Sequence, residues 1–375
     1  MEQIKMVDLH GQYLKIKPEV DTAMQRVLDH CDFVNGSTVA DFANALATYT
    51  GAQKVLTCAN GTDALKLALM ALDLNPGDEV ITVPFTFVST VEVIVSLGLQ
   101  PVFVDVHPDT FNMDVSQIKT AITERTRVIL PVHLFGQCAD METILSIARE
   151  HHLYVVEDAC QALGTEVTFS DGSVHQAGTM GDVGCTSFFP TKNLGCFGDG
   201  GALFANNNTL ASRIFSMANH GMSQKYHYDY IGLNSRLDTL QAAVLLAKLP
   251  HLNEYIATRQ AAAKYYDRAL NDCPDVFLPV EVPFSTHTYH QYTIRLASGN
   301  RDVLREALAA AGVPTMIYYP QALHLQKAYR YLSYTVGTFP IAENLCQTVL
   351  SLPMHTELTM EQLQYITYQL RSFLQ

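Results

Sequence analysis

Short apolar, β-branched runs alternate with segments that carry apolar residues every three or four positions through the first two thirds of the chain. This alternation predicts a mostly parallel sheet of seven strands, covered by helices on both faces. The last two strands follow each other too closely for a helical crossover, so we expect one antiparallel edge strand. The predicted strands are Lys54–Cys58, Glu79–Pro84, Pro101–Val106, Val128–Leu134, Tyr154–Asp158, Cys185–Phe189 and Ala202–Ala205.

Helical periodicity fills the gaps between these strands and dominates the remainder of the chain. The predicted helices of the first part include Thr62–Leu72, Ser89–Leu97, Val115–Ile122, Met141–His151 and Arg236–Leu249, the last of which ends at Pro250. Beyond it we expect helices over Leu252–Leu270, Arg301–Ala311 and Met360–Phe373, with a strand over His290–Leu296. The pattern therefore predicts a large α/β domain (residues 1–249) and a smaller α+β C-terminal domain (residues 250–375).

Composition and charge narrow the class of function. The 375-residue chain has a net charge of −13 and no cluster of Lys and Arg, which argues against a nucleic-acid or anionic-membrane partner. We find no signal-peptide pattern and no run of 18 uncharged apolar residues, so a cytoplasmic protein is expected. The eight cysteines lack metal-ligand spacing, which predicts reduced thiols and no metal site.

One lysine, Lys192, stands between an apolar strand and a glycine-rich run. Burial at a strand end disfavours the ammonium form, so the neutral amine that attacks carbonyl compounds becomes accessible. The glycines let the backbone approach a flat ligand closely. This pattern predicts that Lys192 binds pyridoxal 5'-phosphate (PLP), with Ser187 nearby. A solvated loop lysine is the alternative; a dinucleotide-binding turn fits worse, because a strand instead of a helix follows the glycines.

Polar and aromatic residues also follow three other strands. Gly61 and Thr62 open a helix whose free amides could bind a phosphate group, although this segment could simply cap the helix. Asp158 ends a buried strand, where it could pair with a protonated pyridine nitrogen or cap a helix. Phe87 could stack on a cofactor ring or belong to the core. Since open α/β sheets bind ligands at the carboxyl ends of their strands, we expect these residues and Lys192 in one crevice.

At this point the chain resembles the fold-type I PLP enzymes that aminate nucleotide-linked keto sugars, the DegT/DnrJ/EryC1/StrS group. The resemblance covers essentially the whole chain and is carried by residues 59–65, 157–161, 186–192 and 232–243. It implies a PLP-dependent aminotransferase that moves an amino group from glutamate to a keto sugar nucleotide. It also implies a homodimer with shared active sites.

The resemblance assigns roles to individual residues. Lys192 would hold PLP as a Schiff base and then act as acid and base, while Asp158 would keep the ring nitrogen protonated. Asn234 would reach the phosphate from the partner subunit. The other residues expected to bind the cofactor are Gly61, Thr62, Asp63, Phe87, Gln161 and Ser187.

The resemblance also implies a substrate. The segments around Lys192 and Arg236 are most similar to enzymes that aminate UDP-2-acetamido-2-deoxy-3-oxo-glucuronate for cell-surface polysaccharide or lipopolysaccharide synthesis. Arg236 could bind a carboxylate or phosphate oxygen, or pair with Asp238. Tyr318 and Tyr319 are expected to contact the sugar. Relatives often carry histidine at the first of these two positions, and a tyrosine bears no positive charge at neutral pH.

The alternatives are of two kinds, another substrate for the same enzyme class or another class of protein. Another UDP- or dTDP-linked 3- or 4-keto-6-deoxy sugar is an alternative substrate for an aminotransferase. A PLP sugar dehydratase on the same fold would have histidine in place of Lys192, so this lysine argues against that enzyme class. A non-catalytic regulatory member would have no reason to keep Asp158, Ser187, Lys192 and Asn234 together.

Overall fold

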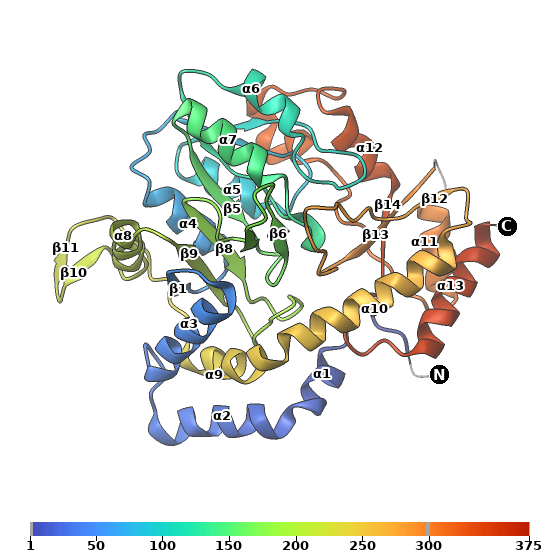
Figure 1. Cartoon of the computed structure of the whole chain (residues 1–375), viewed down its shortest axis with the longest axis horizontal. Helices are drawn as coiled ribbons and strands as arrows, with labels where there is room; N and C mark the ends of the chain where they lie inside the picture. Colours follow the sequence, from blue (N-terminus) through green and yellow to red (C-terminus); the bar gives the residue numbers. More distant parts are fainter. Residues whose placement is uncertain (1–2, 298–300, 375) are drawn as a thin grey trace.

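The structure is a computed structural model that describes residues 3–297 and 301–374. Its centre is a seven-stranded sheet in the order β1-β9-β8-β5-β4-β2-β3 (Figure 1). The sheet confirms the predicted α/β class. Its strands are β1 Lys54–Cys58, β2 Glu79–Thr82, β3 Gln100–Phe103, β4 Thr126–Ile129, β5 Tyr154–Asp158, β8 Val183–Ser187 and β9 Gly201–Ala205.

The pairing of β9 corrects one expectation. Strands β3, β2, β4, β5 and β8 pair in parallel, whereas β9 is antiparallel to both β8 and β1. The antiparallel strand therefore lies inside the sheet, not at its edge as expected. The short connection after β8 turns the chain back beside that strand, and the other side of β9 pairs with β1, which forms the edge.

Two hydrophobic clusters cover the two faces of the sheet. Leu203 of β9 packs with the larger cluster, whereas its neighbours Ala202 and Phe204 pack with the second, as strand alternation requires. Asn60 accepts a hydrogen bond from the Asp63 N–H at 2.8 Å and so caps α4. The helices of this part are α1 Leu9–Lys15, α2 Lys17–His30, α3 Ser37–Thr50, α4 Gly61–Met70, α5 Ser89–Ser96, α6 Ile118–Ala121, α7 Met141–His151, α8 Asn208–Ala218 and α9 Thr239–Lys248.

The C-terminal part is built on a second sheet. Its strands β12 (Val276–Phe277), β13 (Tyr292–Leu296) and β14 (Val349–Leu352) pair antiparallel. The long helix α10 (Leu252–Leu270) runs from the first sheet toward α11 (Arg301–Ala310) and α13 (Met360–Leu374) (Figure 1). The helix α12 (Pro340–Thr348) instead packs with the large cluster of the first sheet. The division at residues 249/250 therefore stays a prediction.

Shorter elements complete the chain. The hairpin β10–β11 projects from the body beside α8 (Figure 1). No helix of residues 3–297 and 301–374 has the length and hydrophobicity needed to cross a membrane. Within the same ranges no three His, Cys, Asp or Glu side chains gather as a metal site would require. The remaining elements are β6 Glu166–Thr168, β7 Val174–Gln176, β10 Met222–Gln224, β11 His227–Tyr228 and the 3₁₀ helices Val115–Gln117, Leu134–Gly136, Leu249–His251, Leu323–Leu325 and Lys327–Leu332.

Candidate active site

Asp158 lies at the carboxyl end of β5 and is 6% exposed. One of its oxygens accepts a hydrogen bond from the Thr90 hydroxyl at 2.8 Å, and the other accepts one from the Cys160 N–H at 3.3 Å. Asp158 forms no salt bridge with any described residue. A buried carboxylate with only neutral donors has capacity for a cationic partner. The sequence did not identify Thr90, which lies in the first turn of α5.

Lys192 follows β8, in a turn closed by its own N–H, which donates to the Phe189 carbonyl at 2.8 Å. Its amine makes no hydrogen bond with the described part of the chain. Burial lowers the pKa of Lys192, and the nearby Cys160 thiol and Asp158 carboxylate oppose this shift. Burial raises the pKa of the Cys160 thiol well above its ordinary value, so that neighbour stays neutral. A neutral lysine amine is therefore accessible beside Asp158.

The start of α4 meets the end of β8 at close range. A Cβ atom added to Gly61 would lie 2.8 Å from the Ser187 Cβ and 3.0 Å from the Cys160 sulfur, so only glycine fits there. The N–H groups of Gly61 and Thr62 have no partner among the described residues, while the Thr62 hydroxyl bonds that of Ser89 at 2.7 Å. Free amides at a helix start beside a serine hydroxyl are suited to a phosphate group. The predicted residue Asp63 lies in the same first turn.

Gln161 connects the loop after β5 to the C-terminal part of the chain. Its side-chain oxygen accepts a hydrogen bond from the Phe135 N–H at 2.9 Å, and its amide nitrogen donates to the Tyr319 hydroxyl at 3.0 Å. Burial raises the pKa of Tyr319, so the phenol keeps its proton. The ring of Phe87, which is 54% exposed, lies 6.3 Å from the Tyr319 ring, centroid to centroid. The sequence predicts Tyr319 as a sugar contact, and this hydrogen bond to Gln161 has no signature in it.

Asn234 and Arg236 flank a residue that contacts the segment before Gly61. Between them, the Ser235 hydroxyl accepts a hydrogen bond from the Ala59 N–H at 3.1 Å, which ties the segment to the end of β1. Asn234 is exposed, and Arg236 is half-buried. Within the described ranges Arg236 forms no ion pair with Asp238, so that alternative is not observed. The guanidinium is free to bind an anion.

Tyr318 is half-buried and sits beside Tyr319, with 5.9 Å between their ring centroids. Burial raises the pKa of Tyr318, and a hydrogen bond with Gln291 opposes this shift. Its hydroxyl is therefore a neutral group.

The arrangement fits PLP on three independent features. The chain offers an unpaired amine for the aldehyde, an unpaired carboxylate for the ring nitrogen, and a helix start with free amides for the phosphate. A phosphate alone would need neither of the first two features, and a nicotinamide dinucleotide would not need the lysine.

Comparison with known proteins points to the same chemistry. Residues 14–371 match the family described as the DegT/DnrJ/EryC1/StrS aminotransferase family. A Geobacillus stearothermophilus protein named pleiotropic regulatory protein is 43% identical over 372 residues, which cover 99% of this chain and 98% of the relative. The UDP-2-acetamido-2-deoxy-3-oxo-D-glucuronate aminotransferase of Pseudomonas aeruginosa is 43% identical over 356 residues, which cover 94% and 95%.

A solved structure agrees across the whole fold. The S. venezuelae protein DesV, in complex with a ketimine intermediate, has a TM-score of 0.96 and 37% sequence identity. The match covers 100% of this chain and 99% of DesV.

Proposed function

Because the chain belongs to the DegT/DnrJ/EryC1/StrS aminotransferase family, whose members depend on PLP, we propose that it holds PLP on Lys192 and transfers an amino group from glutamate to a keto sugar nucleotide. The observation that carries this proposal is the unpaired Lys192 amine beside the unpaired carboxylate of Asp158. The exchange of an amino group for a keto oxygen is redox-neutral. It yields 2-oxoglutarate and an amino sugar without a further oxidant or reductant.

The cofactor residues have two roles: some would bind PLP, and Asp158 would keep its ring protonated. When bound, PLP supplies an electron sink that makes the hydrogen on the nitrogen-bearing carbon acidic. Asp158 holds a proton on the ring nitrogen, which maintains that sink. The amides of Gly61 and Thr62 and the Ser187 hydroxyl hold the phosphate, and Phe87 covers the ring.

Lys192 then acts on the substrate carbon. With its amine free, Lys192 would act as the acid and base of a 1,3-proton shift: it would take a proton from one of the two carbons bonded to the transferred nitrogen and return it to the other. Because burial lowers the pKa of Lys192, the neutral amine needed for the first of these transfers is more accessible than that of a solvated lysine.

For the acceptor we propose UDP-2-acetamido-2-deoxy-3-oxo-glucuronate, aminated at C3. Two observations support this choice: the Arg236 guanidinium lacks an ion pair within the described residues, and a relative named for this substrate is 43% identical. Tyr318, where related proteins often have histidine, favours a neutral keto sugar as the second candidate. A tyrosine in that place can donate a hydrogen bond but cannot neutralise a carboxylate.

We further propose a two-fold dimer in which Asn234 completes the partner's phosphate site. Asn234 is exposed, and it follows an exposed segment that carries large hydrophobic side chains, among them Tyr226 at 75% and Ile231 at 88% exposure. Such a stretch is typical of a surface that another chain covers.

The cofactor assignment is tested by borohydride reduction of the purified protein, followed by peptide mapping. The pyridoxyl group should be found on Lys192, and Lys192→Ala protein should bind PLP without a covalent bond and without turnover. An adduct on another lysine would contradict the assignment. A protein that takes up no PLP at all would favour a regulatory role.

The substrate assignment is tested with Arg236→Ala on two acceptors, the 3-oxo-glucuronate and the matching neutral 3-oxo sugar. If Arg236 binds the sugar carboxylate, the fall in kcat/KM with the uronate should correspond to a loss of about 2–4 kcal/mol of transition-state stabilisation. The loss with the neutral sugar should be far smaller. Arg236→Lys serves as the matched variant that keeps the charge. Equal losses with both acceptors would mean that Arg236 binds the diphosphate instead.

A further inference from the structure

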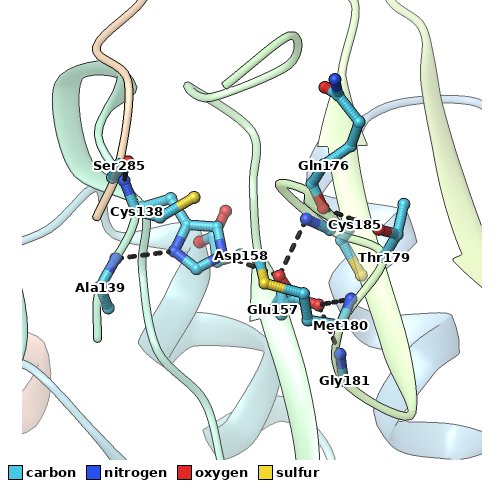
Figure 2. A network of polar contacts seen from close by, with 12 residues as sticks. Cys138, Ala139, Glu157, Asp158, Gln176, Thr179, Met180, Gly181, Cys185 and Ser285 are labelled. Carbon is cyan, nitrogen blue, oxygen red and sulfur yellow. Dashed lines mark hydrogen bonds and ion pairs between the residues drawn. The ribbon is translucent and has the colours of Figure 1, made fainter. Parts of the chain in front are cut away.

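Behind Asp158 lies a second carboxylate that the proposed chemistry does not use. Glu157 precedes it on β5 and is fully buried, on the opposite face of the strand. Each of its two oxygens accepts two hydrogen bonds, which is the arrangement of a carboxylate anion. The donors are His133 Nε2 at 2.9 Å and the N–H groups of Gly178 at 2.8 Å, Met180 at 2.7 Å and Gly181 at 2.6 Å. Figure 2 shows Glu157 with Met180 and Gly181 beside it.

The geometry fixes the proton on His133. Its Nδ1 lies 3.2 Å from the Ala139 N–H, and a backbone N–H can only donate, so Nδ1 carries no proton. The single ring proton is therefore on Nε2, from which it is donated to Glu157. The pair is a neutral imidazole on a carboxylate anion, and no Lys or Arg of the described chain pairs with it.

His133 also contacts the cofactor-facing part of β5 through its backbone. Its N–H donates to the Asp158 carbonyl at 3.0 Å, and the Asp158 N–H donates to the Pro131 carbonyl at 2.9 Å. Two residues further on, the Phe135 N–H orients the Gln161 amide. The loop of residues 133–139 thus holds two of the residues proposed to face the cofactor, and the His133–Glu157 bond anchors the loop.

We propose that Glu157 and His133 are positioning residues of the PLP site, which together hold Asp158 and Gln161 in place. This inference rests on the proposed function. A plain structural bond would hold the fold together but would have no effect on the cofactor. A positioning bond should also change how tightly PLP binds and how fully its ring nitrogen is protonated.

Four variants separate these two roles. His133→Leu removes the donor to Glu157, whereas His133→Gln keeps one, because its amide can donate to the carboxylate and accept from Ala139. Glu157→Gln is the second disruptive variant. In one orientation its amide nitrogen faces the N–H groups of Met180 and Gly181. In the other it faces His133 Nε2, which moves the ring proton to Nδ1, against the Ala139 N–H. Tyr292→Phe is the control, since it removes a part-buried hydrogen bond from Tyr292 of β13 to Asp267 of α10, outside the proposed PLP site.

The measurements are the PLP dissociation constant of the apoprotein, the ¹⁵N signal of ring-labelled PLP, and the Tm of the apoprotein. His133→Leu should weaken PLP binding by about tenfold, the scale of one lost hydrogen bond to a charged group, and should move the ¹⁵N signal toward the unprotonated ring. His133→Gln should restore both readouts. Tyr292→Phe should lower only the Tm.

The inference is overturned if His133→Leu lowers the Tm but leaves PLP affinity and the ¹⁵N signal at the wild-type values. It is also overturned if folded His133→Gln protein is as defective as His133→Leu. Should His133→Leu not fold, Glu157→Gln gives the same comparison. Failure of the proposed function is distinguishable, because the wild-type protein itself would then form no adduct on Lys192.

Discussion

The bond between Gln161 and Tyr319 can be tested by removing one oxygen atom. Tyr319→Phe keeps the ring against Phe87 and deletes the hydroxyl that accepts from the Gln161 amide at 3.0 Å. Gln161 is 9% exposed, so water replaces the lost partner poorly. An unpaired buried donor costs about 1–3 kcal/mol, and we expect the free energy of unfolding of the apoprotein to fall by that amount.

A double-mutant cycle isolates the bond from other effects of each change. Gln161→Met also removes the acceptor of the Phe135 N–H, and the cycle cancels that loss. The coupling between Gln161→Met and Tyr319→Phe, measured by urea unfolding, should be about 0.5–1.5 kcal/mol, the net worth of a neutral hydrogen bond. Tyr318→Phe is the matched control, because it removes a neighbouring hydroxyl that makes no hydrogen bond with Gln161 within the described residues.

Two results would refute this reasoning. A coupling energy indistinguishable from zero would show that the two side chains do not interact. An equal coupling of Gln161→Met with Tyr318→Phe would show that the measured energy belongs to the whole segment. Either result would contradict a stabilising contact between Tyr319, in the C-terminal part of the chain, and Gln161, in the loop after β5.

Three further predictions concern charge, space and assembly. Burial lowers the pKa of Lys248 from 10.5 to about 8, so between these pH values the unfolded state binds more protons than the folded state. The free energy of unfolding should therefore rise with pH across this window by about 3 kcal/mol. Urea unfolding of Lys248→Met protein should show no such rise. Gly61→Ala places a Cβ 2.8 Å from that of Ser187 and should weaken PLP binding about tenfold by fluorescence titration; unchanged affinity would mean that the phosphate lies elsewhere. Mixed Lys192→Ala and Asn234→Ala proteins should recover about a quarter of wild-type activity after subunit exchange, because half of the dimers are hybrids with one intact site; no recovery would contradict shared sites.

The hydrophobic pattern predicts elements best where periodicity is strong. The bounds of α7 and α10 agree with those expected from sequence. The same pattern does not reveal α2, because its residues are mostly polar and few of them are buried. The predicted position of β9 at the sheet edge is also wrong. A local run of apolar residues predicts a strand but does not indicate which strands will pair with it.

In the candidate site, too, the sequence predicts residues that follow a strand but not the partners that come from distant parts of the chain. The rule that ligands bind at strand ends identifies Asp158 and Lys192 from sequence, and the structure brings them together. Thr90 donates to Asp158 across a separation of 68 residues, and Tyr319 accepts from Gln161 across 158 residues. Neither partner has a local signature, because the contact depends on how separate connections pack.

The internal position of β9 has a consequence for synthesis of the chain on the ribosome. Among the described residues, β1 pairs with β9 alone, and Lys54–Cys58 lie opposite Gly201–Ala205. An emerging chain therefore carries β1 without a partner until residue 205 has left the exit tunnel. Pairing over such a separation is slow and leaves an apolar strand open to aggregation or to chaperones. Nascent chains truncated before residue 201 should remain sensitive to protease at β1, while chains extended well past residue 205 should become resistant there.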